Sequence, residues 1–353
     1  MTLQRISKDY LKPNYGLILL IVSYFFNSSM VVSTKVLEND PLETSQSRIN
    51  PLQILLVRMS ITYCCTLVYM HWNKQSVPDI PWGPAPCRKW LILRGIMGFF
   101  GVFGMYFSLM YLSISDAVLI TFMSPTLTIF LSFLLLGEPF SKLEALGSLI
   151  SFSGVVLIIR PTFLFGEQTQ GQQSPQDDIV ETQNPKLRLI AIGVSLLGVC
   201  GLSSVYIIIR YIGNKAHAIM SVSYFSLVTT VVAALGVLLI PSMSLQLPHS
   251  WKQWGLFLNL GISGFIHQIL LTMGIQRERA GRGSLMTYTQ VIYAVFWDVV
   301  LFHHWPNIWT WCGMAVIVSS TIWVINMRAS KQNVVATAEL LSTSDFELDD
   351  LED

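Results

Sequence analysis

Long apolar segments alternate with short polar ones along most of the chain. A helix needs about 20 predominantly apolar residues to cross the hydrocarbon core of a bilayer. Segments of this kind occur at 15–37, 51–72, 90–112, 115–136, 140–160, 187–209, 217–240, 252–275, 282–302 and 306–327. The pattern therefore predicts an all-α integral membrane protein with ten transmembrane helices.

The remaining segments are polar. Residues 1–14 are basic, 161–186 are Gln-rich, acidic and broken by prolines, and 328–353 end in the acidic run STSDFELDDLED. We expect a short N-terminal segment, a flexible linker at 161–186 and a disordered tail. The first apolar segment is not followed by an A-x-A site, so it is expected to remain as an anchor.

Composition agrees with a membrane protein and excludes several other classes. Hydrophobic residues make up 52% of the 353 residues and charged residues 12%, about half the share typical of soluble domains. A net charge of +1 offers no basic surface for nucleic acid. The five cysteines form no CxxC pair, and hydrolase and nucleotide-binding motifs are missing. We therefore expect no metal, no cofactor and no enzymatic activity.

Basic residues are distributed unevenly between the two sides of the predicted bundle. Fourteen of the 22 Lys and Arg residues fall on the side of the N-terminus, six on the opposite side and two inside predicted helices. The positive-inside rule then places both termini in the cytosol. An endomembrane and the plasma membrane of a eukaryotic cell both fit this pattern.

The two halves of the chain resemble each other. Residues 51–160 align with 217–326 at a constant offset of 166, which pairs Gly95 with Gly261, Gly98 with Gly264, Thr121 with Thr287, Phe130 with Phe296 and Gly147 with Gly313. The first helix fits the sixth at an offset of 175, which sets Ser28 on Ser203 and Lys35 on Arg210. Five helices in each half, 15–160 and 187–327, predict an inverted repeat, an architecture that many secondary transporters share.

Polar residues form two stripes at corresponding positions. Thr121, Ser124, Thr128 and Ser132 follow the 3–4–4 spacing of one helix face, and their counterparts are Thr287, Gln290, Ala294 and Asp298. Two interpretations stay open: hydrogen bonds between helices, or the lining of a central solute path. The repeat favours the lining, for which Ser28 and Tyr224 are further candidates.

Arg58 is the most informative single residue, because it lies eight residues inside an apolar segment. A charge in mid-membrane costs at least ~2.5 kcal/mol, so its side chain must face a cavity, a partner or a route to the interface. Reaching the interface would span roughly 11 Å at 1.5 Å per residue, which favours a cavity or substrate role. Arg94, four residues into its predicted helix, is expected to extend to the interface.

Charged residues near helix ends are candidates for gating. Lys35 and Arg210 are expected to orient their helices or to gate the path. We expect Asp298 either to pair with Lys35 or to bind a proton. Glu138 is expected to cap the helix that follows it. His267 is interpreted as a hydrogen-bonded residue of the bundle in preference to a proton relay.

Residues 94–161 resemble the EamA repeat of the drug/metabolite transporter superfamily, through the segments DAVLITFMSP, LGEPFS and GVVLIIRP. Within that superfamily the chain is most similar to the eukaryotic solute carrier 35 G-like group and its fungal relatives. Arg58 stands at the basic position usual in their second helix. The second half departs from the pattern: Val291 replaces the proline that matches Pro125, and HHW replaces the LGE glutamate. The resemblance implies two inverted bundles that transport a small organic solute.

These observations predict a secondary transporter or exchanger of a small polar, anionic or zwitterionic metabolite. A gradient, a proton or a counter-substrate would drive it, because the chain has no ATP-binding motif. The alternative is a membrane regulator or scaffold that keeps the fold without transport. Expected partners are the lipid bilayer and the solute, and a second copy of the chain is a candidate for a homodimer.

Overall fold

A computed structural model describes residues 14–38, 51–77, 79–109, 111–112, 114–160, 185–239, 248, 250–302 and 305–324. All secondary structure in these ranges is helical. Residues 1–13 of the predicted N-terminal segment 1–14, residues 161–184 of the predicted linker and the whole predicted tail 328–353 lie outside the described residues. The last two residues of the predicted linker, Pro185 and Lys186, belong to a helix instead.

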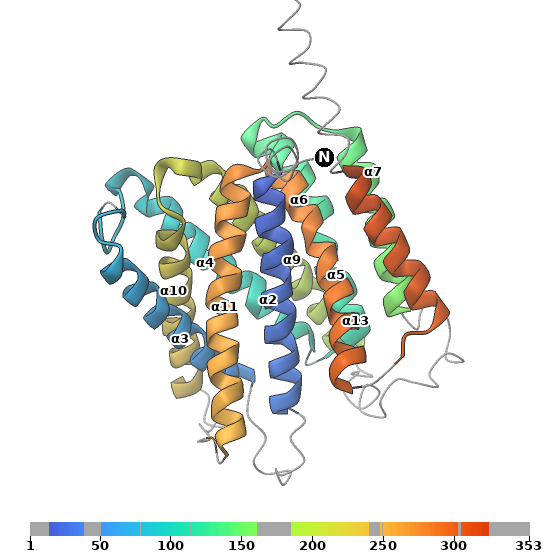
Figure 1. Cartoon of the computed structure of the whole chain (residues 1–353), viewed down its shortest axis with the longest axis horizontal. Coiled ribbons are helices and arrows are strands. Elements are labelled where there is room, and N and C mark those ends of the chain that lie inside the picture. The colour runs from blue at the N-terminus through green and yellow to red at the C-terminus, as the bar shows by residue number, and fades with distance from the viewer. Residues whose placement is uncertain are drawn as a thin grey trace, which may run out of the picture.

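The helices follow one another along nearly all of the predicted apolar segments (Figure 1). They are α2 (Tyr15–Glu38), α3 (Pro51–Trp72), α4 (Arg88–Leu109), α5 (Ile114–Thr121), α6 (Ser124–Leu136), α7 (Lys142–Ile159), α9 (Pro185–Ile212), α10 (Ala218–Leu239), α11 (Trp251–Arg277), α12 (Ala280–Leu285), α13 (Thr289–Phe302) and a last helix at Ile308–Val324. Short 3₁₀ turns are η2 (Ala85–Cys87), η4 (Gly213–Lys215) and η5 (Met286–Tyr288). In the described part of the chain, eight spans are long and apolar enough to cross a membrane.

Two helices that the sequence predicts as continuous are interrupted. The segment 115–136 divides into α5 and α6 at Phe122 and Met123. Pro125 in the first turn of α6 explains this break, because it lacks an N–H and its ring clashes with the carbonyl four residues earlier. The segment 282–302 divides into α12, η5 and α13 without any proline, since Val291 occupies the position that matches Pro125.

The two interruptions lie against each other. The rings of Phe122 and Tyr288 stack at a centroid distance of 5.9 Å with 18° between their planes. The Tyr288 hydroxyl also donates a hydrogen bond to the Phe122 carbonyl at 3.3 Å. These two residues are related by the same offset of 166 that relates the two halves of the sequence, so each half contributes its break to one shared contact.

Helices of the first half pack mainly against helices of the second half. α2 packs against α11 and α13, and α9 packs against α4 and α6. α3 and α10 pack together on one side of the bundle. α7 and the helix Ile308–Val324 lie side by side at the other edge (Figure 1), joined by Ser151 and Ser320 at 3.0 Å.

Glycines allow two of these helix pairs to approach closely. A Cβ atom on Gly104 of α4 would lie 2.6 Å from the Cα of Gly198 on α9, so the two backbones touch. On the α2–α11 side, a Cβ on Gly274 would lie 2.6 Å from Cγ of Leu20, so a side chain fills the space. Small residues of this kind permit the close packing on which helix association in membranes depends.

The outer surface of the bundle is apolar and ends in tryptophans. Leu197 and Leu238 are 66% and 78% exposed in the middle and end of their helices. Trp72, Trp251 and Trp305 are 82%, 91% and 76% exposed and lie at or near helix ends. Indole rings prefer the boundary between lipid and water, so this distribution fits a chain surrounded by a bilayer.

Candidate functional site

Three hydroxyl groups from three helices meet at the interruption η5. Tyr24 of α2 and Tyr206 of α9 are buried and hydrogen-bonded to each other. Thr287 Oγ1 lies 2.8 Å from the Tyr24 hydroxyl and 3.1 Å from the Tyr206 hydroxyl. Thr287, selected from the sequence, therefore lies in a polar cluster at a helix break. The two tyrosines were missed, because nothing in the sequence signals that α2 and α9 converge on η5.

The stripe on the first half has a different environment. Thr121 donates to the carbonyl of Ala117, and Thr128 donates to the carbonyl of Ser124. The Ser124 carbonyl also accepts from Ser203 of α9 at 3.0 Å. Thr121 and Thr128 thus bond to backbone carbonyls of their own helices, and the hydrogen bond from Ser203 is of the interhelical kind left open above.

The other sequence-selected polar residues are dispersed. Ser28 on α2 is 1% exposed, and Gln290 on α13 is partly buried. Tyr224 on α10 donates to the Trp82 carbonyl at 3.0 Å, so it anchors the connection between α3 and α4. Among the described residues, no group of three His, Cys, Asp or Glu side chains could hold a metal ion.

A second polar region contains two buried arginines. Arg94 is 1% exposed; its Nη2 donates to Oε1 of Gln268 at 2.7 Å, and its guanidinium lies 4.2 Å from the centre of the Phe225 ring. Its Nε and Nη1 make no hydrogen bond within the described part of the chain. The prediction that Arg94 extends to the interface is wrong. α4 begins at Arg88, two residues before its predicted start, and Phe225 of α10 and Gln268 of α11 cover the side chain.

Arg58 lies beside α11, where Gly264 leaves room for its side chain. A Cβ atom on Gly264 would lie 3.2 Å from the Arg58 Nε, and Arg58 is 9% exposed. His267 follows one turn later, with its Nδ1 2.8 Å from Oγ and 3.1 Å from the carbonyl oxygen of Ser23. The positive charges of Arg58 and Arg94 both act on this imidazole. His267 is thus a hydrogen-bonded residue of the bundle, in a strongly cationic environment.

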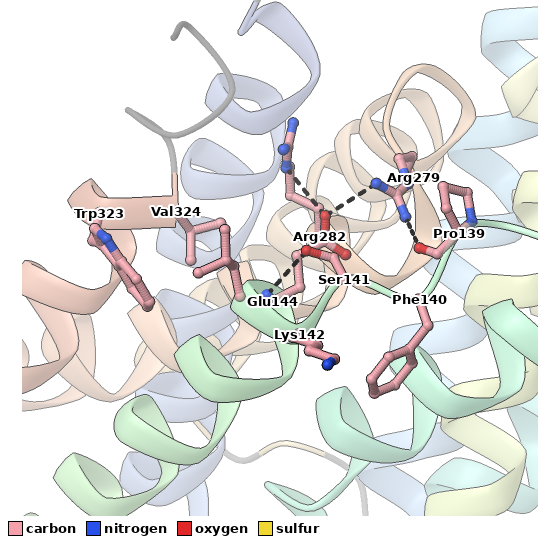
Figure 2. Close-up of a pocket in the computed structure, with 10 residues that line it drawn as sticks. Pro139, Phe140, Ser141, Lys142, Glu144, Arg279, Arg282, Trp323 and Val324 are labelled. Carbon is pink, nitrogen blue, oxygen red and sulfur yellow. Dashed lines mark hydrogen bonds and ion pairs between the residues drawn. The ribbon is translucent and has the colours of Figure 1, made fainter. Parts of the chain in front are cut away.

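Five charged side chains form an ion-pair network at one end of the bundle. Arg210 Nε lies 3.1 Å from Oε1 of Glu138. Arg279 lies 3.3 Å from Oε1 of Glu144 and 4.0 Å from Oε2 of Glu138, and Arg282 lies 3.9 Å from Oε1 of Glu144. Figure 2 shows Arg279 and Arg282 directed toward Glu144. The network joins the α6–α7 corner to α9 and to the start of α12.

Glu138 does not cap α7, contrary to expectation. Ser141 caps this helix by accepting from the Glu144 N–H at 3.3 Å. Gly137 ends α6 with a φ of 64°, which turns the chain so that Glu138 faces the second half. There its Oε2 accepts from the Ala280 N–H at 3.2 Å, at the start of α12. Glu138 therefore connects two helices distant in sequence.

The opposite end of the bundle holds ion pairs of its own among the described residues, one of them between Nη2 of Arg188 on α9 and Oδ2 of Asp116 on α5 at 3.6 Å. Lys35 Nζ on α2 lies 3.8 Å from Oδ1 of Asp298 on α13, and both side chains are about half exposed. This is the pairing that the sequence offered for Asp298. It corresponds to the Arg210–Glu138 pair, because each joins the end of a first-in-half helix to the interrupted helix of the other half.

A pocket of about 320 Å³ lies next to the ion-pair network. Its lining comes from the α6–α7 corner, the start of α12 and the last described turn of the chain: Pro139, Phe140, Ser141, Lys142, Leu143, Glu144, Arg279, Arg282, Trp323 and Val324 (Figure 2). Three separate segments build this pocket, so no local sequence pattern could have revealed it.

Apolar helices, buried polar clusters and ion pairs at both ends define an all-helical multi-pass membrane protein. The EamA-like transporter family matches residues 14–160 and again residues 188–326, and the chain belongs to this family.

Several relatives are similar over most of the chain. The uncharacterized membrane protein YMR253C of Saccharomyces cerevisiae is 68% identical over 336 residues, which cover 95% of this chain and 81% of the yeast protein. Human solute carrier family 35 member G1 is 29% identical over 68% of this chain and 63% of its own length. The pseudopaline exporter CntI of Pseudomonas aeruginosa is 24% identical over 66% and 73%, respectively. A crystal structure with 17% identity shares the fold, with a TM-score of 0.68 over 90% of this chain and 99% of the other.

Proposed function

We propose that the protein is a secondary transporter or exchanger that moves a small, negatively charged or zwitterionic metabolite by alternating access. Family membership supports transport of a solute across a membrane. The relatives named as a solute carrier and an exporter support the same general activity. A proton or a counter-substrate would provide the driving force.

The architecture that we propose has ten transmembrane helices in two inverted repeats, 15–160 and 187–327, with both termini in the cytosol. The reciprocal packing of α2 on α11 and α13, and of α9 on α4 and α6, supports this symmetry. So do the two matches to the same family model. In this orientation the ion-pair network faces the cytosol and the Lys35–Asp298 pair faces the opposite side.

The buried guanidinium of Arg94 is the observation that carries the proposal. Its described contacts, Gln268 and Phe225, are both neutral. A buried charge is costly unless it is paired, and an anionic group of the solute would compensate it. Arg58, on α3, is a second positive charge that acts on the same His267 as Arg94 does. Together they favour an anion over a cation as the transported species.

The second half keeps the helix interruption of the first half, although its sequence departs from the family pattern. Val291 replaces the proline, yet the helix is still interrupted at η5. Thr287 at that interruption contacts hydroxyls from both halves. These observations favour the transporter over the scaffold that lacks transport.

Uptake by purified protein in proteoliposomes, measured with a library of metabolites of defined charge, tests the proposal. We expect saturable uptake of one or more anions, and loss of that uptake in Arg58→Ala and Arg94→Gln. Removing a buried charge eases insertion, so neither variant should lower expression. Arg58→Lys should keep part of the uptake activity. The lysine ammonium keeps the positive charge but lacks the several hydrogen-bond donors of the planar guanidinium.

The controls separate a solute-binding role from a structural one. Lys74→Gln removes an exposed charge in the turn that follows α3 and should transport normally. Thermal unfolding of each variant shows whether lost uptake reflects lost structure. Full uptake by both Arg58→Ala and Arg94→Gln, or uptake of cations alone, would contradict the proposal.

A further inference from the structure

The pocket beside the ion-pair network has the size and composition of a ligand site. Its volume of about 320 Å³ falls in the range of small-molecule sites, which begins near 300 Å³. Lys142, Arg279 and Arg282 line it from two different elements, α7 and the start of α12. The Lys142 side chain is exposed and has no acidic partner among the described residues.

The charge around this pocket is positive. The described residues of the pocket and its network include four cations and two carboxylates, namely Lys142, Arg210, Arg279 and Arg282 against Glu138 and Glu144. The N-terminus of α7, a helix of 18 residues, lies at the same place and adds its partial positive charge. A phosphate group suits this environment, because it accepts several charge-assisted hydrogen bonds at once.

Exposed apolar side chains lie on the same two helices that line the pocket, α7 and the helix Ile308–Val324. Phe140 is 48% exposed at the rim, and Trp323 lines the wall from the last helix. Below them, Leu146 and Leu149 of α7 and Ile322 of the last helix are about half exposed and apolar. A headgroup in the pocket would therefore have an apolar surface for its acyl chains directly beside it, which a free phosphate in water does not need.

We propose that this pocket binds the phosphate of an anionic phospholipid from the adjacent leaflet. Lys142 and Arg282 contact the phosphate, and the acyl chains lie along α7 and the helix Ile308–Val324. Because Arg279 and Arg282 also pair with Glu144, the bound phosphate competes with that carboxylate and loosens the contact between α7 and α12. Binding of this lipid does not depend on which solute is transported.

Thermal unfolding in nanodiscs tests the site. The protein is placed in discs of phosphatidylcholine alone or in discs that also contain phosphatidylglycerol. We expect phosphatidylglycerol to raise the Tm of the unmodified protein by roughly 2–4 °C, since a ligand that binds only the folded state stabilises it. Lys142→Gln should reduce the lipid affinity about fivefold, the effect of one basic side chain near a membrane surface. Native mass spectrometry measures the retained lipid directly.

Matched variants distinguish this site from general attraction of anionic lipid. Arg282→Gln should reduce binding as Lys142→Gln does, whereas Lys74→Gln, an exposed lysine outside the pocket, should bind as the unmodified protein. An equal loss in Lys74→Gln and Lys142→Gln would overturn the proposal, as would no response to phosphatidylglycerol. The same unfolding measurement is repeated with inorganic phosphate in place of phosphatidylglycerol. If phosphate alone reproduces the rise in Tm and phosphatidylglycerol adds nothing to it, the assignment to a lipid is overturned.

Discussion

Ion pairs close the two ends of the bundle in different ways. At one end, Arg210 and Glu138 are 3.1 Å apart and only 31% and 12% exposed, and three more charged residues join them. At the other end, Lys35 and Asp298 are 3.8 Å apart and 54% and 47% exposed. Exposed pairs contribute at most about 1 kcal/mol, whereas shared and partly buried pairs are screened less. We infer that the network end is the firmly closed one.

This difference bears on the alternating access that we propose, in which the two ends would open in turn. Opening the network end would separate five charged groups. It would also break the hydrogen bond that the Ala280 N–H donates to Glu138. The opposite end holds the half-exposed Lys35–Asp298 pair and the Arg188–Asp116 pair, which share no charged group with each other. In the proposed mechanism the larger cost of opening would therefore lie at the α6–α7 corner, and the substitutions below measure it.

The largest effect is expected for Glu138→Gln. The amide can still accept from Ala280, but it no longer compensates Arg210 and Arg279. We expect a loss of roughly 1–3 kcal/mol of stability, below the range for fully buried pairs because both arginines are partly solvated. Thermal unfolding of the purified protein measures this, and an unchanged Tm would show that the network does not hold this end closed.

Asp298→Asn is the matching change at the opposite end. It removes one charge from a half-exposed pair, so we expect a loss of less than about 1 kcal/mol. The same unfolding measurement applies, with Lys35→Gln as the reciprocal variant. If Asp298→Asn destabilises the protein as much as Glu138→Gln does, the proposed asymmetry between the two ends is wrong.

Salt should sharpen the contrast between the two pairs. The screening length falls to about 3 Å at 1 M ionic strength, which suppresses interactions between exposed charges. Double-mutant cycles on Lys35–Asp298 and on Arg210–Glu138 give each coupling energy at low and high salt. We expect the first to vanish at high salt and the second to persist in part. Equal loss in both would contradict the difference in burial.

A smaller effect of pH is expected at the network end. His217 lies between α9 and α10, and burial lowers the pKa of its imidazole below the ordinary 6.5. Its Nδ1 accepts from the Ile219 N–H at 3.3 Å, which requires the neutral ring. This contribution to stability is complete above 6.5. It is lost as the pH falls below that value, because the unfolded chain then binds a proton that the folded chain resists.

The change to measure is the drop in Tm between about pH 7.5 and about pH 5.5. His217→Asn keeps a side chain that can accept from a backbone N–H but does not titrate in this range. We expect the variant to show a smaller drop than the unmodified protein. The same drop in both proteins would assign the pH effect to other groups.

Periodicity was enough to place the helices, because apolar segments of the right length are specified locally. Only one of the two helix breaks has a signal in the sequence. Pro125 is the signal for the break between α5 and α6. The break at η5 has no proline nearby, and there Thr287 and Tyr288 contact residues of other helices.

The sequence predicted a polar contact correctly only where the sign of a charge and its position along the helix were enough to identify the partner. Lys35 and Asp298 form the expected pair for that reason. Arg94 was misjudged because its surroundings, Phe225 and Gln268, come from helices more than 130 residues away. Glu138 was assigned to the wrong helix, since Gly137 turns it toward α12 and away from α7. The contacts of a side chain that depend on tertiary packing cannot be predicted from a local sequence pattern.

The bare contact between Gly104 and Gly198 leaves no room for a side chain where α4 and α9 cross. One turn away, Leu202 of α9 fills the space beside Gly101, so this crossing combines a backbone contact with a leucine. The corresponding pair, α2 and α11, has the same combination: Leu20 lies against Gly274, and a Cβ on Gly274 would lie 3.0 Å from the Gly16 carbonyl oxygen. The two crossings are therefore built alike, and a residue larger than glycine at either of them would force its two helices apart.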